Sequence, residues 1–187
     1  MRYKLIRYAM YERLWEVFPE GITGKVLGIS GVPHLRPFFT EETRLTVTSY
    51  PEVDMMDMPY EDETFDYVIS DQILEHLEDP FQAVQESHRV LKTGALAVHT
   101  SCMINYYHPC PVDLWRFTTD GLRLLCRDFD EIIECDGWGN RIAIFLYFLN
   151  WRFRYMDIPD NPVSLRHRLA MYNEPEYHMS TWIIARK

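Results

Sequence analysis

Three side chains of this sequence are well suited to accepting a proton from a substrate: His108, His76 and Asp113. An imidazole titrates near neutral pH and can therefore act as a general base. We expect His108 to be the base, because it lies in the loop from Cys102 to Asp113 that follows an apolar run. His76 and Asp113 are the alternatives, and His76 could equally be a packing residue. His99 lies inside the apolar run, so we expect it to be buried and structural.

Aromatic and basic side chains surround His108 in the sequence and predict a substrate-binding loop. The candidates are Tyr106, Tyr107, Trp115 and Arg116. Aromatic rings suit the face of a sugar or another planar substrate, and an arginine suits a carboxylate or a phosphate. The alternative is a tyrosine-rich packed loop, in which Trp115 belongs to the core and Arg116 pairs with Asp113.

The elements that must position these residues alternate between helices and strands. Apolar residues at helical spacing predict helices over residues 2–18, 80–91, 118–126 and 141–153. Short apolar runs predict strands over residues 25–30, 44–48, 65–70, 95–100, 129–135 and 181–186. Such runs are typical of a largely parallel sheet with helices on both faces, so the expected fold class is α/β. Ligands bind these sheets beyond the carboxyl ends of the strands, here in segments 28–33, 48–54, 70–76 and 100–108.

Length, charge and cysteine content narrow the class of protein further. The 187 residues fit a single domain over 1–187, with an N-terminal helix within 1–20 and a surface excursion over 157–178. A formal net charge of −9 argues against a nucleic-acid partner. The four cysteines have no zinc-ligand spacing, so we expect reduced thiols and no metal. Neither a signal peptide nor a transmembrane segment is recognisable, which favours a cytoplasmic protein.

The segment 141–155 is strongly apolar and ends in two arginines. A core helix is the favoured interpretation. The alternative is a surface that makes peripheral contact with a membrane, or with a partner subunit. The sequence does not indicate an oligomeric state.

A run of motifs at fixed spacing carries a family resemblance. It comprises Asp54, Met58-Pro59-Tyr60, Phe65-Asp66, Leu74-Glu75-His76 and Arg89-Val90-Leu91-Lys92-Thr93-Gly94. This pattern resembles the class I methyltransferases that use S-adenosyl-L-methionine (SAM), in particular the small members of type 11. Ala95 replaces the second glycine of the last motif. The resemblance implies a Rossmann-like, mostly parallel sheet, pared down between its first two strands, and SAM as the cofactor.

The resemblance also implies a glycine-rich turn after the first strand, which would contact the cofactor. The family has an acidic residue followed by x-Gly-x-Gly, whereas this chain has Gly28, Ser30 and Val32 at the three fixed positions, with Gly31 between the last two. We assign Gly28, Ser30 and Gly31 to cofactor binding. A plain strand-to-loop turn is the alternative.

Three further segments correspond to cofactor contacts in the family. The ribose acid falls at Ser49 or Tyr50, and neither is acidic. Asp54 corresponds to the residue that binds the adenine amino group, and Met55 would pack on the adenine ring; the alternatives are a loop-capping Asp and a core Met. The turn after the central strand, which comprises Ser70, Asp71 and Gln72, would lie beside the methionine part of the cofactor.

The resemblance therefore implies a SAM-dependent methyltransferase. Transfer requires an acceptor aligned with the methyl group and freed of its proton. The stretch HPCPVDLWRFTTDGL is similar to a segment of small members encoded among surface-polysaccharide genes, so we expect a small-molecule or glycan hydroxyl or amine acceptor. The alternative is a non-catalytic ligand- or partner-binding module with a degenerate cofactor site. A nicotinamide-dependent oxidoreductase is disfavoured, because GxGxxG is absent after the first strand.

Overall fold

A six-stranded sheet organises the molecule in the computed structural model, which describes residues 3–30 and 32–187. The strands are β1 (Lys25–Ile29), β2 (Arg44–Thr48), β3 (Phe65–Asp71), β4 (Leu91–Cys102), β5 (Glu131–Trp138) and β6 (Ser180–Arg186). Their order is β2-β1-β3-β4-β6-β5. The first four are parallel, and β6 runs antiparallel to both of its neighbours, β4 and β5. The predicted α/β class with a mostly parallel sheet is confirmed.

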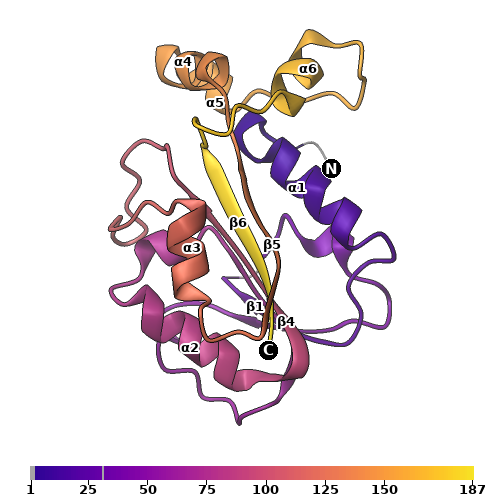
Figure 1. Ribbon diagram of the computed structural model, residues 1–187, viewed down its shortest axis with the longest axis vertical. Helices are drawn as coiled ribbons and strands as arrows, with labels where there is room; N and C mark the ends of the chain where they lie inside the picture. Colours follow the sequence, from indigo (N-terminus) through magenta and orange to yellow (C-terminus); the bar gives the residue numbers. More distant parts are fainter. Residues whose placement is uncertain (1–2, 31) are drawn as a thin grey trace.

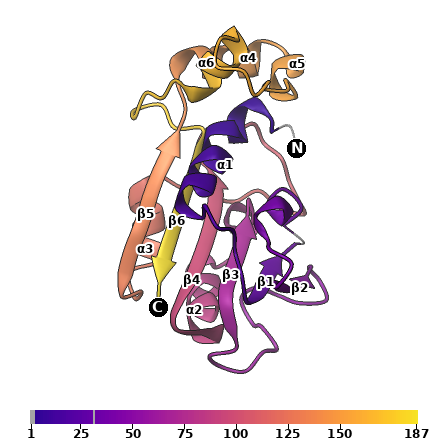
Figure 2. The ribbon, with the colours of Figure 1, turned by 90° about the vertical axis from the view of Figure 1, so that its right-hand side faces the viewer.

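Helices cover both faces of the sheet (Figures 1 and 2). The helical elements are α1 (Leu5–Val17), η1 (Arg36–Phe38), η2 (Leu74–His76), α2 (Pro80–Val90), α3 (Thr119–Leu125), α4 (Arg141–Leu149), α5 (Trp151–Arg154) and α6 (Leu165–Met171). Neighbouring residues of β4 point to opposite faces, as the pleat requires. Val98 packs in the core cluster under α1, and Ala97 packs in the cluster under α2 and α3. The sheet is therefore buried on both sides.

Side-chain caps determine where three of the helices begin. Asp79 accepts a hydrogen bond from the Gln82 amide at 3.0 Å, and Pro80 follows in the first turn of α2. Thr118 caps α3 by accepting from the Gly121 amide at 3.0 Å. Asn140 caps α4 in the same way. Each of these residues replaces a hydrogen-bond partner that the first turn of a helix lacks.

Three expectations about the carboxyl-terminal half need correction. The predicted helix 141–153 is two helices, because Asn150 is extended and caps α5 by accepting from the Arg152 amide at 3.0 Å. The core-helix interpretation is wrong, since Phe145 is 64% exposed and only Ala143 and Tyr147 of α4 are buried. The excursion over 157–178 contains α6, which was not predicted.

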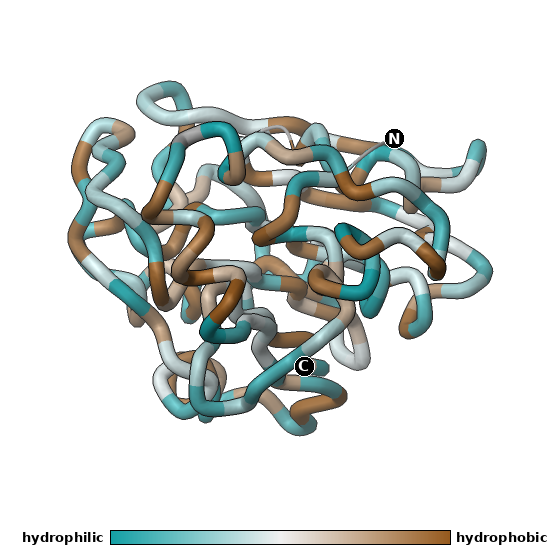
Figure 3. Tube along the Cα trace, turned by 90° about the horizontal axis from the view of Figure 1, so that it is seen from above, coloured by the Kyte–Doolittle hydropathy of each residue, from teal (hydrophilic) through white to brown (hydrophobic). Residues whose placement is uncertain are grey.

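Helices α4, α5 and α6 gather at one end of the molecule, beyond the carboxyl ends of the parallel strands (Figures 1 and 2). Seen from this end, hydrophobic and hydrophilic segments alternate along the chain (Figure 3). Within the described residues no helix is both long and apolar enough to cross a membrane. We call α4, α5 and α6, with the loops that join them, the cap (residues 141–171).

Candidate active site

The carboxyl ends of β1, β3 and β4 lie side by side. Ile29 is paired with Ser70, and Ser70 is paired with His99. The loops that leave these strands therefore meet at one edge of the sheet, where parallel sheets bind ligands. Two cavities open there, with volumes of about 350 and 240 Å³.

The larger cavity, which we call the acidic cavity, lies over β1 and β3. Its lining contains the carboxylates of Asp54 and Glu78, and none of its described lining residues is a lysine or an arginine. Six of the residues assigned from the sequence line it: Ser30, Tyr50, Asp54, Met55, Gln72 and His76. Its volume falls within the usual range for small-molecule sites.

Asp54 and Met55 have the structural roles that the sequence offered as alternatives, and both also line the acidic cavity. Asp54 Oδ1 accepts a hydrogen bond from the Met56 amide at 2.8 Å, so this carboxylate caps its own loop while lining the acidic cavity. Met55 is 3% exposed and belongs to the core cluster under α2, yet it also forms part of the cavity wall. The apolar wall and the adjacent carboxylate are both held in fixed positions.

The turn after β1 keeps the backbone of a glycine turn without the glycines. Ser30 has φ of +57° and Val32 has φ of +36°, in the region that favours glycine. The Ser30 amide donates to the carbonyl of Thr48 at 2.7 Å, which ties the turn to β2. Gly31 lies outside the described residues. The positions at which the family carries glycine are therefore the positions with a left-handed backbone.

Gln72 also has positive φ, +61°, directly after β3. Its amide donates to the carbonyl of Thr100 at 3.0 Å, and its side-chain Nε2 donates to Thr100 Oγ1 at 3.2 Å. These two hydrogen bonds hold Gln72 in a left-handed backbone conformation that is unfavourable for a residue other than glycine. Strained residues of this kind are common at functional sites. The same bonds hold the Gln72 side chain in place at the edge of the acidic cavity.

Three other residues assigned to the cofactor do not line the acidic cavity. A side chain at Gly28 would meet Val32 Cγ2 at 2.8 Å, so this glycine makes room for a buried valine. Ser49 Oγ donates to Glu52 at 3.3 Å. Ser70 is fully buried, and its Oγ lies 2.8 Å from Nδ1 of His99, where burial lowers the imidazole pKa to about 4. The prediction that His99 is buried and structural is confirmed.

Asp71, a fourth residue assigned to the cofactor, lines neither cavity, but it contacts two residues that line the smaller one. Its carboxylate accepts hydrogen bonds from the Tyr11 hydroxyl and from Thr100 Oγ1, both at 2.7 Å. Arg7 lies 3.8 Å away. Burial, together with the neighbouring Asp71, raises the pKa of the Tyr11 phenol. Asp71 thus joins the end of β3 to helix α1.

The smaller cavity, which we call the basic cavity, lies between α1, the loop after β4 and the cap. Its described lining contains no Asp or Glu. The residues that line it are Tyr3, Lys4, Ile6, Arg7, Tyr11, His34, Asn105, Tyr106, His108, Tyr147, Arg154 and Tyr155. It is therefore aromatic and cationic, the opposite of its neighbour.

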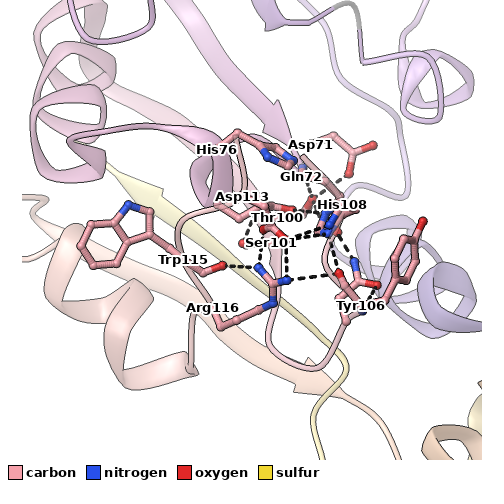
Figure 4. A network of polar contacts seen from close by, with 12 residues as sticks. Asp71, Gln72, His76, Thr100, Ser101, Tyr106, His108, Asp113, Trp115 and Arg116 are labelled. Carbon is pink, nitrogen blue, oxygen red and sulfur yellow. Dashed lines mark hydrogen bonds and ion pairs between the residues drawn. The ribbon is translucent and has the colours of Figure 1, made fainter. Parts of the chain in front are cut away.

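His108 is held in this lining by its own loop (Figure 4). Its Nδ1 lies 2.9 Å from the Tyr106 carbonyl, and its amide donates to Asp113 Oδ2 at 2.9 Å. A carbonyl can only accept, so this contact places the ring proton on Nδ1 and leaves a lone pair on Nε2. The Asn105 amide nitrogen lies 3.4 Å from this Nε2 atom.

His76 and His108 bring the two cavities together. His76 lines the acidic cavity, His108 lines the basic cavity, and their ring centroids are 5.1 Å apart in an edge-to-face arrangement. His76 Nδ1 is 2.5 Å from the carbonyl of Val112. The imidazole pair therefore stands at the junction where a group from one cavity would reach a group in the other.

Asp113 holds the His108 loop in place, and both of its oxygens are occupied by other side chains. It is bound through both of its oxygens by Arg116, at 2.5 and 2.8 Å, and His108 Nδ1 lies 3.3 Å from Oδ2 (Figure 4). The Arg116 guanidinium holds the pKa of this carboxyl well below its usual range. The predicted Asp113–Arg116 pair is confirmed, and it leaves Arg116 outside both cavities.

Of the remaining residues predicted to bind the substrate, Tyr106 lines a cavity, whereas Tyr107 and Trp115 are exposed and line neither. Tyr106 lines the basic cavity, and the Arg154 guanidinium carbon lies 3.3 Å from the centre of its ring. Tyr107 is 73% exposed. Trp115 is 43% exposed and donates from Nε1 to the carbonyl of Leu77, so its assignment to the core is wrong.

The fold also assembles a cluster that spacing along the sequence did not suggest. Ligand-type atoms of Glu75, Cys102 and His108 lie within 4.8 Å of one another. Glu75 is fully buried: Oε2 accepts from Ser101 Oγ at 2.8 Å, and Oε1 lies 4.0 Å from His108 Nε2. Burial, with Glu75 nearby, raises the pKa of the Cys102 thiol to about 12. At neutral pH the cluster therefore presents a protonated thiol rather than a thiolate ligand.

Several residues of the basic cavity were missed because they come from α1 and the cap. Tyr3, Arg7 and Tyr11 recur every four residues, which places them along one face of a helix. That spacing was the available signal. Arg154 was noted only as the end of an apolar segment.

Comparisons with known proteins agree with this architecture. Residues 12–99 match the family model described as Methyltransferase domain. A 2-methyl-6-phytyl-1,4-hydroquinone methyltransferase of Oryza sativa subsp. japonica is 34% identical over 104 residues, 54% of this chain and 29% of that protein. A demethylmenaquinone methyltransferase of Staphylococcus carnosus is 33% identical over 79 residues, 42% of this chain and 33% of that protein. The match thus spans at most a third of the length of these two relatives.

Solved structures extend the likeness to the whole chain. The [4+2]-cyclase SpnF has a TM-score of 0.59 at 18% identity, over 95% of this chain and 79% of that chain. A SAM-dependent methyltransferase from Archaeoglobus fulgidus has a TM-score of 0.55 at 14% identity, over 98% and 95%. At such identities these likenesses concern the fold. The motif run and the family match make residues 12–99 similar to a methyltransferase domain, and the solved structures show that the whole chain has the fold of SAM-dependent methyltransferases.

Proposed function

We propose that this protein transfers a methyl group from SAM to an oxygen or nitrogen of a small-molecule acceptor. The observation that carries the proposal is the pair of oppositely charged cavities that meet at His76 and His108. A cofactor and an acceptor must be held separately and aligned at one point. Two cavities with one junction meet that requirement.

The acidic cavity fits the cofactor by charge and by shape. The sulfonium is cationic, and the adenine amino group and the ribose hydroxyls are hydrogen-bond donors, so carboxylates without lysine or arginine are suitable partners. Asp54 and Glu78 would supply them, Met55 would pack on the adenine, and Gln72 would face the methionine part. When bound, the cofactor supplies an electrophilic methyl group.

His108 would take the proton of the acceptor. The contact between its Nδ1 and the Tyr106 carbonyl would leave Nε2 as the atom that takes the proton, and Asp113 fixes the loop by accepting from the His108 amide. A positioned general base typically contributes 10²–10⁴-fold to rate. His76 stands on the cofactor side of the junction and would exclude water from it.

A non-catalytic or differently catalytic module is the second candidate. The family's ribose acid is absent at Ser49 and Tyr50, and a neighbour of the same fold is named a [4+2]-cyclase, so the fold alone does not dictate methyl transfer. The named relatives act on a hydroquinone and a menaquinone precursor. The tyrosines of the basic cavity suit such a ring as well as a glycan.

Calorimetric titration of SAM, and of its demethylated product, separates these candidates. We expect micromolar binding that Asp54→Ala weakens by at least tenfold, because that variant removes an acceptor of hydrogen bonds from the ligand. Asp57→Ala is the matched control, since Asp57 is exposed and does not line the cavity. No binding at millimolar cofactor would rule out the proposed methyltransferase activity.

The exposed face of α4 supports a proposal about location. Ile142, Phe145, Phe148 and Leu149 are all more than half exposed, and helix α6, which contacts α4, carries the exposed arginines Arg166 and Arg168. An apolar face with arginines on a neighbouring helix suits an anionic lipid surface. Flotation with phosphatidylglycerol vesicles should recover the protein, Phe145→Ser should reduce recovery, and Leu124→Ser on α3 should not. Recovery that is equal with phosphatidylcholine, or unchanged by Phe145→Ser, would refute the lipid contact.

A further inference from the structure

We infer that the basic cavity selects an acceptor that carries a negative charge, a carboxylate or a phosphate attached to a ring. The inference rests on the proposed function, because it treats this cavity as the acceptor site. It adds the chemical class of the acceptor, which neither the family match nor the fold specifies.

The charge of the cavity is the first argument. The chain carries 28 acidic and 19 basic side chains, so an arbitrary patch of its surface should be acidic. The described lining of the basic cavity reverses this balance: Lys4, Arg7 and Arg154 contribute three cations, and no carboxylate lines it. Local reversal of sign in a cavity focuses the field on ligands of opposite charge.

Arg154 is the cation best placed to receive such a ligand. Its guanidinium lies 3.3 Å from the centre of the Tyr106 ring and within 6 Å of the centres of the Tyr147 and Tyr155 rings. None of the ion pairs in the described part of the chain involves it. A guanidinium stacked by its face keeps its N–H edge available for a carboxylate or phosphate.

The other two cations are partly engaged. Lys4 Nζ lies 2.6 Å from Asp157, which satisfies its charge. Arg7 lines the cavity and forms an ion pair with the buried carboxylate of Asp71 at 3.8 Å, which is longer than a hydrogen bond. Burial lowers the pKa of His34, which therefore contributes a neutral imidazole. Arg154 and Arg7 are the two groups that would form the anion subsite.

The aromatic lining defines the rest of the ligand. Tyr3, Tyr11, Tyr106, Tyr147 and Tyr155 give the cavity five rings, which suit a planar or sugar ring. His108 lines the same cavity, so a ring hydroxyl could reach its Nε2 while the anionic group meets Arg154. The recognised unit is a hydroxylated ring with one anionic substituent.

Paired probes test this directly. 4-Hydroxybenzoate is compared with 4-hydroxybenzamide, glucuronate with glucose, and phenyl phosphate with phenol, by ligand-observed NMR on the whole protein. We expect at least one anionic probe to bind about tenfold more tightly than its neutral partner, since charge-assisted hydrogen bonds are about twice as strong as neutral ones. Inorganic phosphate is the control for binding to the anion subsite alone.

Variants separate the subsite from general loss of fold. Arg154→Gln should abolish the preference for the anionic probe, and Arg154→Lys should keep part of it. Arg152→Gln is the matched control, because Arg152 lies in the same helix and does not line the cavity. Equal binding of charged and neutral probes, no binding of any probe at millimolar concentration, or an unchanged preference in Arg154→Gln would overturn the inference. SAM titration of the same samples reports separately on the acidic cavity.

Discussion

The acidic and basic cavities share one edge of one sheet and differ in almost everything else. The acidic cavity is lined mainly by loops that follow β1, β2 and β3, and contains two carboxylates without a lysine or arginine in its described lining. The basic cavity is lined by α1, the loop after β4 and the cap, with three cations and no described carboxylate. Under the proposed function, this opposite charge would hold the cofactor and the acceptor in separate cavities.

The difference also separates what this chain shares with its relatives from what is particular to it. The family match ends at residue 99 and includes most of the acidic cavity, whereas Asn105, Tyr147 and Arg154 lie beyond it. On the proposed function, a common cofactor would constrain the acidic cavity and the acceptor would constrain the basic cavity. Acceptor specificity should therefore be altered through α1 and the cap.

The largest expected effect comes from breaking the junction between the cavities. His108→Gln removes the basic Nε2, and methyl transfer to an acceptor found by screening anionic phenols and sugars should fall by about 10²–10⁴-fold. SAM affinity should stay within twofold, because His108 does not line the acidic cavity. Single-turnover rates with labelled SAM give the first quantity and calorimetry the second. A loss of both together would mean that the two cavities are not independent.

A measurement of stability against pH tests the buried part of the sheet at the end of which the cavities lie. His99 is fully buried beside Ser70, and burial lowers its pKa to about 4, against an ordinary value near 6.5. The unfolded chain therefore binds a proton that the folded chain excludes, and stability should fall by ~3 kcal/mol as the pH drops from 7 to 4. Urea unfolding of wild type and His99→Gln measures the difference, with His167→Gln as control. Parallel pH profiles for wild type and His99→Gln would contradict it.

Glu78 contributes to the difference in charge between the acidic and basic cavities. Glu78→Gln removes one of the two carboxylates of the acidic cavity, and SAM affinity should fall by about tenfold, which is typical of losing a charged hydrogen-bond partner. Binding of the anionic probes in the basic cavity should not change. Calorimetry with each ligand decides this, and Glu61→Gln, on an exposed loop, is the control. An equal effect on both ligands would show that the charge difference is not local.

The smallest effect concerns the turn at the rim of the acidic cavity. Ser30 has a left-handed backbone that costs a non-glycine residue about 1 kcal/mol, so Ser30→Gly should stabilise the protein by about that amount. Thermal unfolding measures it, and Ser49→Gly serves as a control, because Ser49 is not among the described residues with positive φ. Destabilisation by Ser30→Gly would mean that the hydroxyl, not the backbone, maintains the turn.

Sequence reasoning succeeded where periodicity and short-range rules apply. All six strands and the α-helices α1, α2 and α3 were predicted near their observed positions, because apolar runs and helix N-cap residues such as Thr118 are local signals. The acidic cavity followed from motifs with fixed spacing. The basic cavity was not predicted from the sequence, since it forms where α1 and the cap pack together. Packing of this kind brings together residues more than 100 positions apart. The exposed face of α4 was the alternative rather than the favoured interpretation, because an apolar helix has the same sequence whether or not another element covers it.

The position of β6 has a consequence for how the protein is made. Strand β5 pairs with β6 alone, and β6 inserts between β4 and β5. During synthesis β5 therefore leaves the ribosome without a partner, and β4 keeps one unpaired edge until Ser180–Arg186 emerges. Unpaired edges invite association with other chains. The four parallel strands can assemble early, while the antiparallel third of the sheet, which supports the basic cavity, must wait for residues 180–186.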